Sequence, residues 1–137
     1  MVNPSIIQTR LRKLDEYLGI LYQAKRYSKE EFLASPERYG SVERFLQLAI
    51  ESVNDIGNHI VADENMGCVD WRTGVPKRLA EAGALTEELE REWVKMIGFR
   101  TALVHDYVDV DREIVFDVLQ SRLGVFEELR KSFARWL

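Results

Sequence analysis

The chain has 137 residues, of which 46% are hydrophobic and 31% are charged, a balance typical of a folded globular protein. This length predicts one domain over residues 1–137. The formal net charge of −4 excludes a broadly basic nucleic-acid binder, although a small local basic site is still allowed. The single cysteine, Cys68, excludes an internal disulfide, and no apolar run approaches the ~20 residues that cross a bilayer. We therefore expect a cytoplasmic protein.

Helix-start signals organise the first half of the chain. Asn3 as N-cap and Pro4 at the first helical position predict a helix over roughly residues 4–26. Apolar residues then follow in steps of four and three, as in a bundle helix. The members of this stripe are Ile7, Leu11, Leu14, Leu18 and Leu21. Ser28 with Glu31 fits a capping box and predicts a short second helix that ends before Pro36.

The third helix is expected to start after a break at Tyr39-Gly40 and to run from near Ser41 to about Asp63. Its apolar stripe is broad, which predicts a central position in the fold. The members of the stripe are Val42, Phe45, Leu46, Ala49, Ile50, Val53, Ile56 and Ile60.

The second half of the chain predicts three more helices. Pro76 starts a short one that Gly83 closes, and Thr86 caps a long one that carries acidic residues in its first turn. Asp109 or Asp111 opens a last helix that runs to the C-terminal Trp136 and Leu137. No segment alternates apolar and polar residues as a strand would. The fold class is therefore all-α, an antiparallel four-helix bundle with one or two additional short helices.

Polar residues gather beside the stripe of the third helix, at Asn54, Asp55, Asn58 and His59. Asp55 and His59 are four residues apart, so their side chains are able to touch. One interpretation is a solvated polar edge that holds this pair. The other is the wall of a polar pocket that faces His105.

The richest stretch is 96–111, MIGFRTALVHDYVDVD. It continues the apolar stripe of Leu89, Trp93 and Met96, and Arg100 falls on that stripe, where a guanidinium is costly unless an anion or water meets it. His105, Asp106 and Tyr107 follow within two turns. An arginine is suited to holding a phosphate and a histidine to moving protons near neutral pH, which together suit phosphodiester chemistry.

The spacing leaves the geometry of this group open. Residues five apart on a helix are separated by roughly 140°, so Arg100 and His105 do not share a face by default. Either the arginine wraps round, or the helix loosens, or two chains contribute across a dimer axis. Arg100 with Tyr107, and Thr101 with His105, do share a face. Each residue also has a structural interpretation: a salt-bridged arginine, a histidine favouring the helix dipole, turn aspartates and a core tyrosine.

Other chemistries lack their motifs. The chain has no Gly-rich phosphate loop, no HExxH helix and no CxxC pair, and its two histidines make a metal site improbable. We expect neither metal nor cofactor. Arg72, Lys77 and Arg78 form a small basic group that reads more readily as a solvated loop than as a phosphate site.

The segment FRTALVHDYVDVD resembles the R-x4-H-x-Y signature of HepT-like toxins, a family of the HEPN superfamily. Arg100, His105 and Tyr107 fall on the three signature positions. The likeness extends to ESVNDIGNHIVAD and GVPKRLAEAGALTEEL, and so covers most of the chain. The residue after the arginine is Thr101, where the family often has asparagine.

The resemblance implies a helical homodimer whose two motifs face each other. It implies a metal-independent endoribonuclease of a type VII HepT/MntA-like toxin–antitoxin system, which uses the 2′-hydroxyl of RNA and leaves a 2′,3′-cyclic phosphate. Arg100 would stabilise the phosphate and His105 would act as general acid or base. The implied partner is a minimal nucleotidyltransferase (MNT-type) antitoxin that attaches AMP to Tyr107.

Two other functions remain open from the residues. The acidic net charge and Thr101 are compatible with a non-catalytic helical subunit that binds nucleotide or a partner nucleotidyltransferase. A purely structural helical dimer is the third, and a carboxylate that fully occupies Arg100 would favour it.

Overall fold

The computed structural model describes residues 2–67, 74–105 and 110–137. Those ranges contain seven helices and no strand, which confirms the all-α fold class. The helices are α1 (Pro4–Ala24), α2 (Lys29–Ala34), α3 (Pro36–Asp63), α4 (Gly74–Glu81), α5 (Glu87–His105), α6 (Arg112–Ser121) and α7 (Leu123–Ala134). Within the described ranges, no helix combines the length and apolar character that a membrane span requires.

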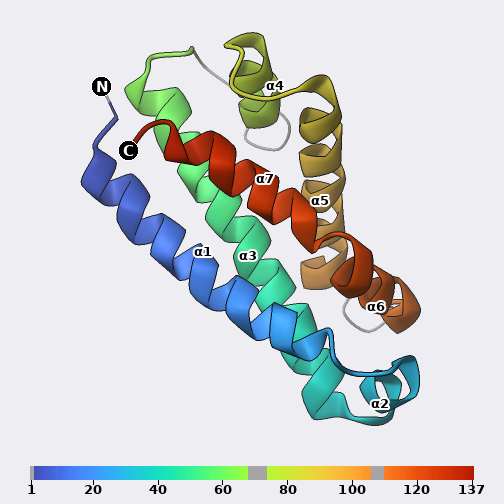
Figure 1. The fold of residues 1–137 in the computed structure, drawn as a ribbon. Coiled ribbons are helices and arrows are strands. Elements are labelled where there is room, and N and C mark those ends of the chain that lie inside the picture. The colour runs from blue at the N-terminus through green and yellow to red at the C-terminus, as the bar shows by residue number, and fades with distance from the viewer. Residues whose placement is uncertain (1, 68–73, 106–109) are drawn as a thin grey trace.

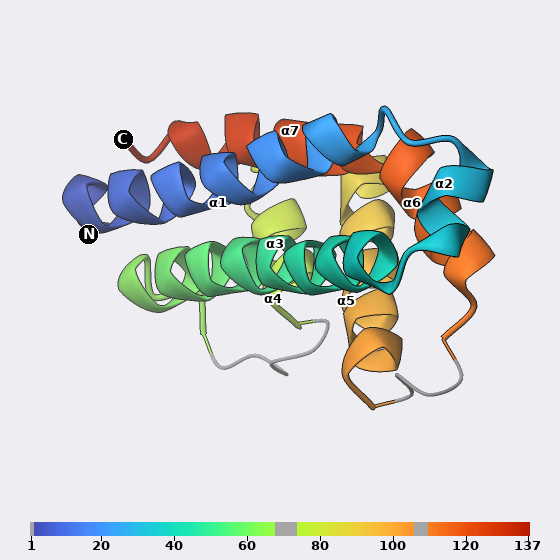
Figure 2. The same ribbon diagram turned by 90° about the horizontal axis from the view of Figure 1, so that it is seen from below.

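Three long helices form the body of the bundle. α1 and α7 lie side by side and pack over α3 (Figures 1 and 2). α5 runs from the level of α7 past α3 at a steep angle to both and contacts both (Figure 2). The short α2 and α6 pack together at one end, while both chain termini lie at the other (Figure 1). α3 contacts each of the other six helices, as its broad apolar stripe predicts.

Several predicted helix caps are confirmed. The Asn3 side chain accepts a hydrogen bond of 3.0 Å from the Ser5 N–H, and Pro4 is the first residue of α1. The Ser28 hydroxyl accepts from the Glu31 N–H at 3.1 Å, and the Glu31 carboxylate accepts from the Ser28 N–H at 2.9 Å. These two bonds complete the capping box. The Thr86 hydroxyl accepts from the Leu89 N–H at 3.1 Å at the start of α5.

The predicted break at Gly40 is wrong. α3 begins at Pro36 and passes through Gly40 without interruption. Ser35 and Pro36 supply a stronger start signal, because the Ser35 hydroxyl accepts from the Arg38 N–H at 3.4 Å and Pro36 needs no hydrogen-bond acceptor there. One glycine inside a long, well-packed helix costs only about 1 kcal/mol, which the packing of α3 exceeds.

The expected single last helix is two helices. Asp111 caps the first, accepting from the Glu113 N–H at 2.9 Å, and α6 and α7 then separate at Arg122. The Ser121 hydroxyl donates to the Asp117 carbonyl at 2.6 Å, a back-bond that bends helices. The bend turns α6 toward α2, and α7 returns along α1 (Figure 1).

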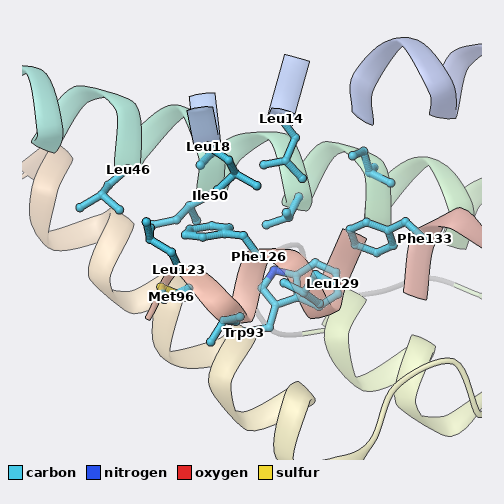
Figure 3. Packing of buried hydrophobic residues seen from close by; sticks show 14 of the residues in the cluster. Leu14, Leu18, Leu46, Ile50, Trp93, Met96, Leu123, Phe126, Leu129 and Phe133 are labelled. Carbon is cyan, nitrogen blue, oxygen red and sulfur yellow. The ribbon is translucent and has the colours of Figure 1, made fainter. Parts of the chain in front are cut away.

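Buried side chains from the long helices meet in one core, which Figure 3 shows from close by. Trp93 from α5 is fully buried and meets the Phe133 ring edge-on, with 5.7 Å between centroids. Its indole N–H donates to Asn54 Oδ1 at 2.8 Å. A Cβ added to Gly57 would lie 2.5 Å from Trp93 Cη2. The absence of a side chain at Gly57 therefore allows α3 and α5 to approach closely.

Candidate functional site

Arg100 lies on α5 and faces α3, where its Nη2 donates to Glu51 Oε1 at 3.1 Å. Gln47 Nε2 donates to the same oxygen at 3.2 Å. The two charged side chains are only 26% and 31% exposed. Arg100 Nε is buried and has no hydrogen-bond partner in the described part of the chain. The guanidinium is thus held by one carboxylate oxygen while part of its donor capacity is unused.

A hollow of about 180 Å³ opens beside this pair. α3 contributes its polar stripe, α5 contributes Ile97, Arg100 and Thr101, and α4 contributes Val75. The members of the stripe are Glu51, Asn54, Asp55 and Asn58. The hollow therefore combines one guanidinium, two carboxylates, two amides and two apolar side chains, which is a donor and acceptor set suited to a polar, partly planar ligand.

Three of the four polar residues predicted on the third helix, Asn54, Asp55 and Asn58, do line a pocket wall, but the wall faces Arg100 and Thr101. His59 does not line this hollow. His105 is the last residue of α5, is exposed, and does not line the hollow. Thr101 donates its hydroxyl to the Ile97 carbonyl at 3.2 Å, within its own helix. In the single chain, Arg100 and His105 therefore do not line this hollow together.

The expected pairing of His59 with Asp55 is not what the structure has. His59 Nε2 lies 3.0 Å from Asp63 Oδ2, although not in hydrogen-bond geometry. Asp63 is also four residues from His59, on the C-terminal side, so the spacing alone did not choose between the two carboxylates. Asp55 is exposed and lines the hollow beside Arg100 instead.

Some predicted residues lie outside the described ranges: Asp106, Tyr107, Asp109, Cys68 and Arg72. Of the expected basic group near the loop, Arg78 is paired with Glu81 at 3.0 Å and Lys77 is exposed.

Glu51 is the residue that sequence reasoning missed. Its signal was present, because Glu51, Asn54, Asp55 and Asn58 follow the helical spacing i, i+3, i+4, i+7 and form one polar stripe. Such a stripe on a helix expected to be central predicts a buried polar partner on a neighbouring helix. Arg100, placed on an apolar stripe, is that partner.

Comparison with known proteins gives the family. Residues 7–133 match the family described as "Ribonuclease HepT-like". The chain is 33% identical over 115 residues to a "tRNA nuclease HepT" of Aphanizomenon flos-aquae, which covers 84% of this chain and 78% of that protein. It is 34% identical over 83 residues to an "mRNA nuclease HepT" of Shewanella oneidensis, which covers 61% of this chain and 62% of that protein.

Solved structures agree with this match. A toxin–antitoxin complex with AMP-PNP contains a chain of TM-score 0.85 and 26% identity, with 93% of this chain and 96% of that chain covered. A tri-AMPylated Shewanella oneidensis HEPN toxin in complex with an MNT antitoxin has TM-score 0.84 and 27% identity, with coverage of 93% and 95%. The Bacillus subtilis protein YutE shares the fold at 20% identity, with TM-score 0.83 and coverage of 99% and 91%.

These matches confirm the resemblance carried by Arg100, His105 and Tyr107, and the ribonuclease class expected from it. The chain belongs to the HepT-like ribonuclease family.

Proposed function

We propose that this chain is the RNA-cleaving toxin of a toxin–antitoxin pair, and that Arg100 and His105 carry the reaction. The observation that supports it most is the state of Arg100, partly buried on α5 yet incompletely bonded and open to a polar hollow. Buried donors are normally satisfied, so an unused one beside a cavity favours a ligand site. His105 ends the same helix five residues later.

The chemistry needs few groups. A base removes the proton of the RNA 2′-hydroxyl, the 2′-oxygen attacks the neighbouring phosphorus, and the bond to the 5′-oxygen breaks as an acid protonates that oxygen. The products are a 2′,3′-cyclic phosphate and a 5′-hydroxyl. His105 serves as base or acid, and Arg100 stabilises the charge that grows on the phosphate oxygens.

A homodimer completes the site in this proposal. His105 is exposed and Arg100 faces α3, so one chain does not present both to one hollow. Two copies with facing α5 ends would bring a histidine of one chain to an arginine of the other. The second copy would also supply the second proton-transfer group that the reaction requires.

RNA turnover by the purified protein tests the proposal. Wild type is expected to cleave RNA in the presence of a metal chelator and to leave 2′,3′-cyclic phosphate ends. His105→Ala is expected to abolish cleavage, because proton transfer contributes about 10²–10⁴-fold to rate. An unchanged helical circular dichroism spectrum is the folding control. Equal cleavage by His105→Ala would rule the mechanism out.

The proposal also includes neutralisation by AMP transfer. One relative of known structure is an AMPylated toxin bound to an MNT antitoxin, and Tyr107 falls on the signature tyrosine here. An AMP group on Tyr107 would add a phosphate near Arg100 in sequence. Mass spectrometry after coexpression with a cognate nucleotidyltransferase is expected to show the adduct on Tyr107 and its loss in Tyr107→Phe. An adduct on another tyrosine would contradict this assignment.

The Glu51–Arg100 pair favours one second candidate, a non-catalytic subunit that binds nucleotide or a nucleotidyltransferase. A carboxylate already on the guanidinium, with Asp55 in the same hollow, lowers the attraction for a phosphate. This candidate predicts binding of nucleotide or partner without RNA turnover, so the same RNA assay separates the two functions.

A further inference from the structure

A second hollow of about 390 Å³ lies next to the one that Arg100 lines, and the two share Asp55 and Asn58. Arg10 from α1 lines this second hollow together with His59 and Ala62 from α3. α1 and α3 pack side by side along their length, so the surface continues from one helix to the other (Figure 1). Asp55 and Asn58 thus form a ridge with an arginine on each side.

Arg10 has no hydrogen bond or ion pair with any described residue, and its side chain is half-buried. The nearest candidate anions are otherwise placed. Asp63 lies beside His59, and Asp55 is not within ion-pair distance of either Arg10 or Arg100. An arginine held on a helix face without a counter-ion among the described residues is a ready partner for an external anion.

The two arginines suit two phosphates of a nucleic-acid strand, one beside the Arg100–Glu51 pair and one beside Arg10. One phosphate would meet the Arg100 guanidinium and the next would meet the Arg10 guanidinium. The sugar and base between them would meet Asp55 and Asn58. Asp55 repels a phosphate placed on the ridge but accepts hydrogen bonds from a 2′-hydroxyl or a base N–H, and Asn58 both donates and accepts. Two small adjacent hollows suit a single strand, whereas recognition of double-stranded RNA extends over about 16 base pairs.

We infer that Arg10 binds the phosphate of a nucleotide next to the one at Arg100, with the ridge contacting the sugar or base between them. This inference rests on the proposed function and gives its substrate class, a single-stranded RNA that crosses α3 toward α1. Arg10 is a binding residue in this account and takes no part in bond cleavage.

The test measures binding of a labelled single-stranded oligoribonucleotide by fluorescence anisotropy over a series of salt concentrations. All proteins carry His105→Ala so that the RNA stays intact. Adding Arg10→Ala is expected to weaken binding at every sequence. The slope of log affinity against log salt should also become less steep by about 0.7, the value for one phosphate contact on a single strand.

Arg12→Ala is the matched control. It removes one positive charge from the same helix, but Arg12 is exposed, lies about 200° round from Arg10 and does not line the hollow. It should leave the slope unchanged. Asn58→Ala should weaken binding with no change in slope, because Asn58 carries no charge. Circular dichroism checks that each variant folds.

An unchanged slope in Arg10→Ala, or the same change in Arg12→Ala, would overturn the inference. The inference would also be overturned if Arg10→Ala lost binding to the nucleotidyltransferase partner while its RNA binding stayed intact. The wild-type cleavage assay decides the proposed function separately: RNA that binds with the Arg10-dependent slope but is never cut would leave the binding surface standing and remove the catalytic role.

Discussion

Two arginine–carboxylate pairs in this molecule differ in how fully they are bonded. Arg130 on α7 donates from Nε and Nη2 to both oxygens of Asp15 on α1, at 2.6 and 2.8 Å. Arg100 on α5 donates once to Glu51 on α3, at 3.1 Å, through an oxygen it shares with Gln47. Arg130 and Asp15 are 35% and 43% exposed, so the less complete pair is also the less exposed one.

This difference supports the proposed ligand-binding role of Arg100, because its Nε, to which no described residue bonds, belongs to a side chain that lines a hollow. Near water, an unused donor costs little, whereas a buried one costs the desolvation of that group. The Arg130–Asp15 pair joins α7 to α1, and the hydrogen bond with Asp15 raises the pKa of Arg130. The Arg100–Glu51 pair leaves Arg100 Nε without a hydrogen bond among the described residues, as the proposed function requires.

The largest expected effect is on the packing that holds Arg100 in place. Gly57→Ala would push a methyl group to 2.5 Å from Trp93 Cη2 and 2.8 Å from Val75 Cγ1, both in the core beside the hollow. We expect the free energy of unfolding to fall by about 2–3 kcal/mol, from overpacking. Urea denaturation measures it.

Gly40→Ala is the control for that substitution. Gly40 is on the same helix, and an added Cβ would meet nothing within 4 Å. We expect this change to raise stability by up to about 1 kcal/mol, since alanine is the better helix former. Similar losses in both variants would contradict the close approach of α3 and α5.

A smaller effect distinguishes the two pairs directly. Arg130→Ala is expected to lower the free energy of unfolding by about 1 kcal/mol, the upper range for an exposed pair with good geometry. Arg100→Ala is expected to change it by less, about 0.5 kcal/mol, because Arg100 makes one hydrogen bond to Glu51, and Glu51 stays 31% exposed and keeps its hydrogen bond from Gln47. Thermal unfolding of both variants measures the two losses. A larger loss in Arg100→Ala than in Arg130→Ala would contradict this prediction.

The smallest effect concerns a third pair, Arg112–Glu43, at 3.4 Å between α6 and α3. Burial raises the pKa of Glu43 above its ordinary value of 4.5, and the nearby Arg112 lowers it by less. The folded chain therefore holds this proton more tightly than the unfolded chain does. Stability should fall as pH rises from 4.5 through the raised folded-state pKa of Glu43.

Glu43→Gln should remove that fall. The free energy of unfolding, measured from mildly acidic to neutral pH, would then decline less with pH than in wild type. Glu30→Gln, at an exposed carboxylate on α2, is the control and should follow wild type. A steeper decline in Glu43→Gln would show that the pair with Arg112 outweighs burial.

Local signals in the sequence predicted most of the fold. The caps at Asn3, Ser28, Thr86 and Asp111 each act within a few residues along the chain, so their partners were visible in the sequence. The break at Gly40 failed because tertiary packing along α3 overrides the low helix propensity of one glycine.

The site was predicted less completely, because its partners are far apart in the chain. Arg100 and Glu51 are 49 residues apart, and Trp93 and Asn54 are 39 apart. Helical spacing shows which residues share a face but not which two faces meet. It identified Arg100 as a cation needing an anion, and Asp55 with Asn58 as a polar wall, without showing that these surround one hollow.

The most direct measurement of the central claim is the RNA cleavage rate of Arg100→Ala beside that of Arg130→Ala. If the incompletely bonded arginine stabilises the phosphate, Arg100→Ala should lose about 10²–10³-fold in rate with its fold intact, while Arg130→Ala, though less stable, should cleave as wild type does. Wild-type cleavage by Arg100→Ala would contradict the account.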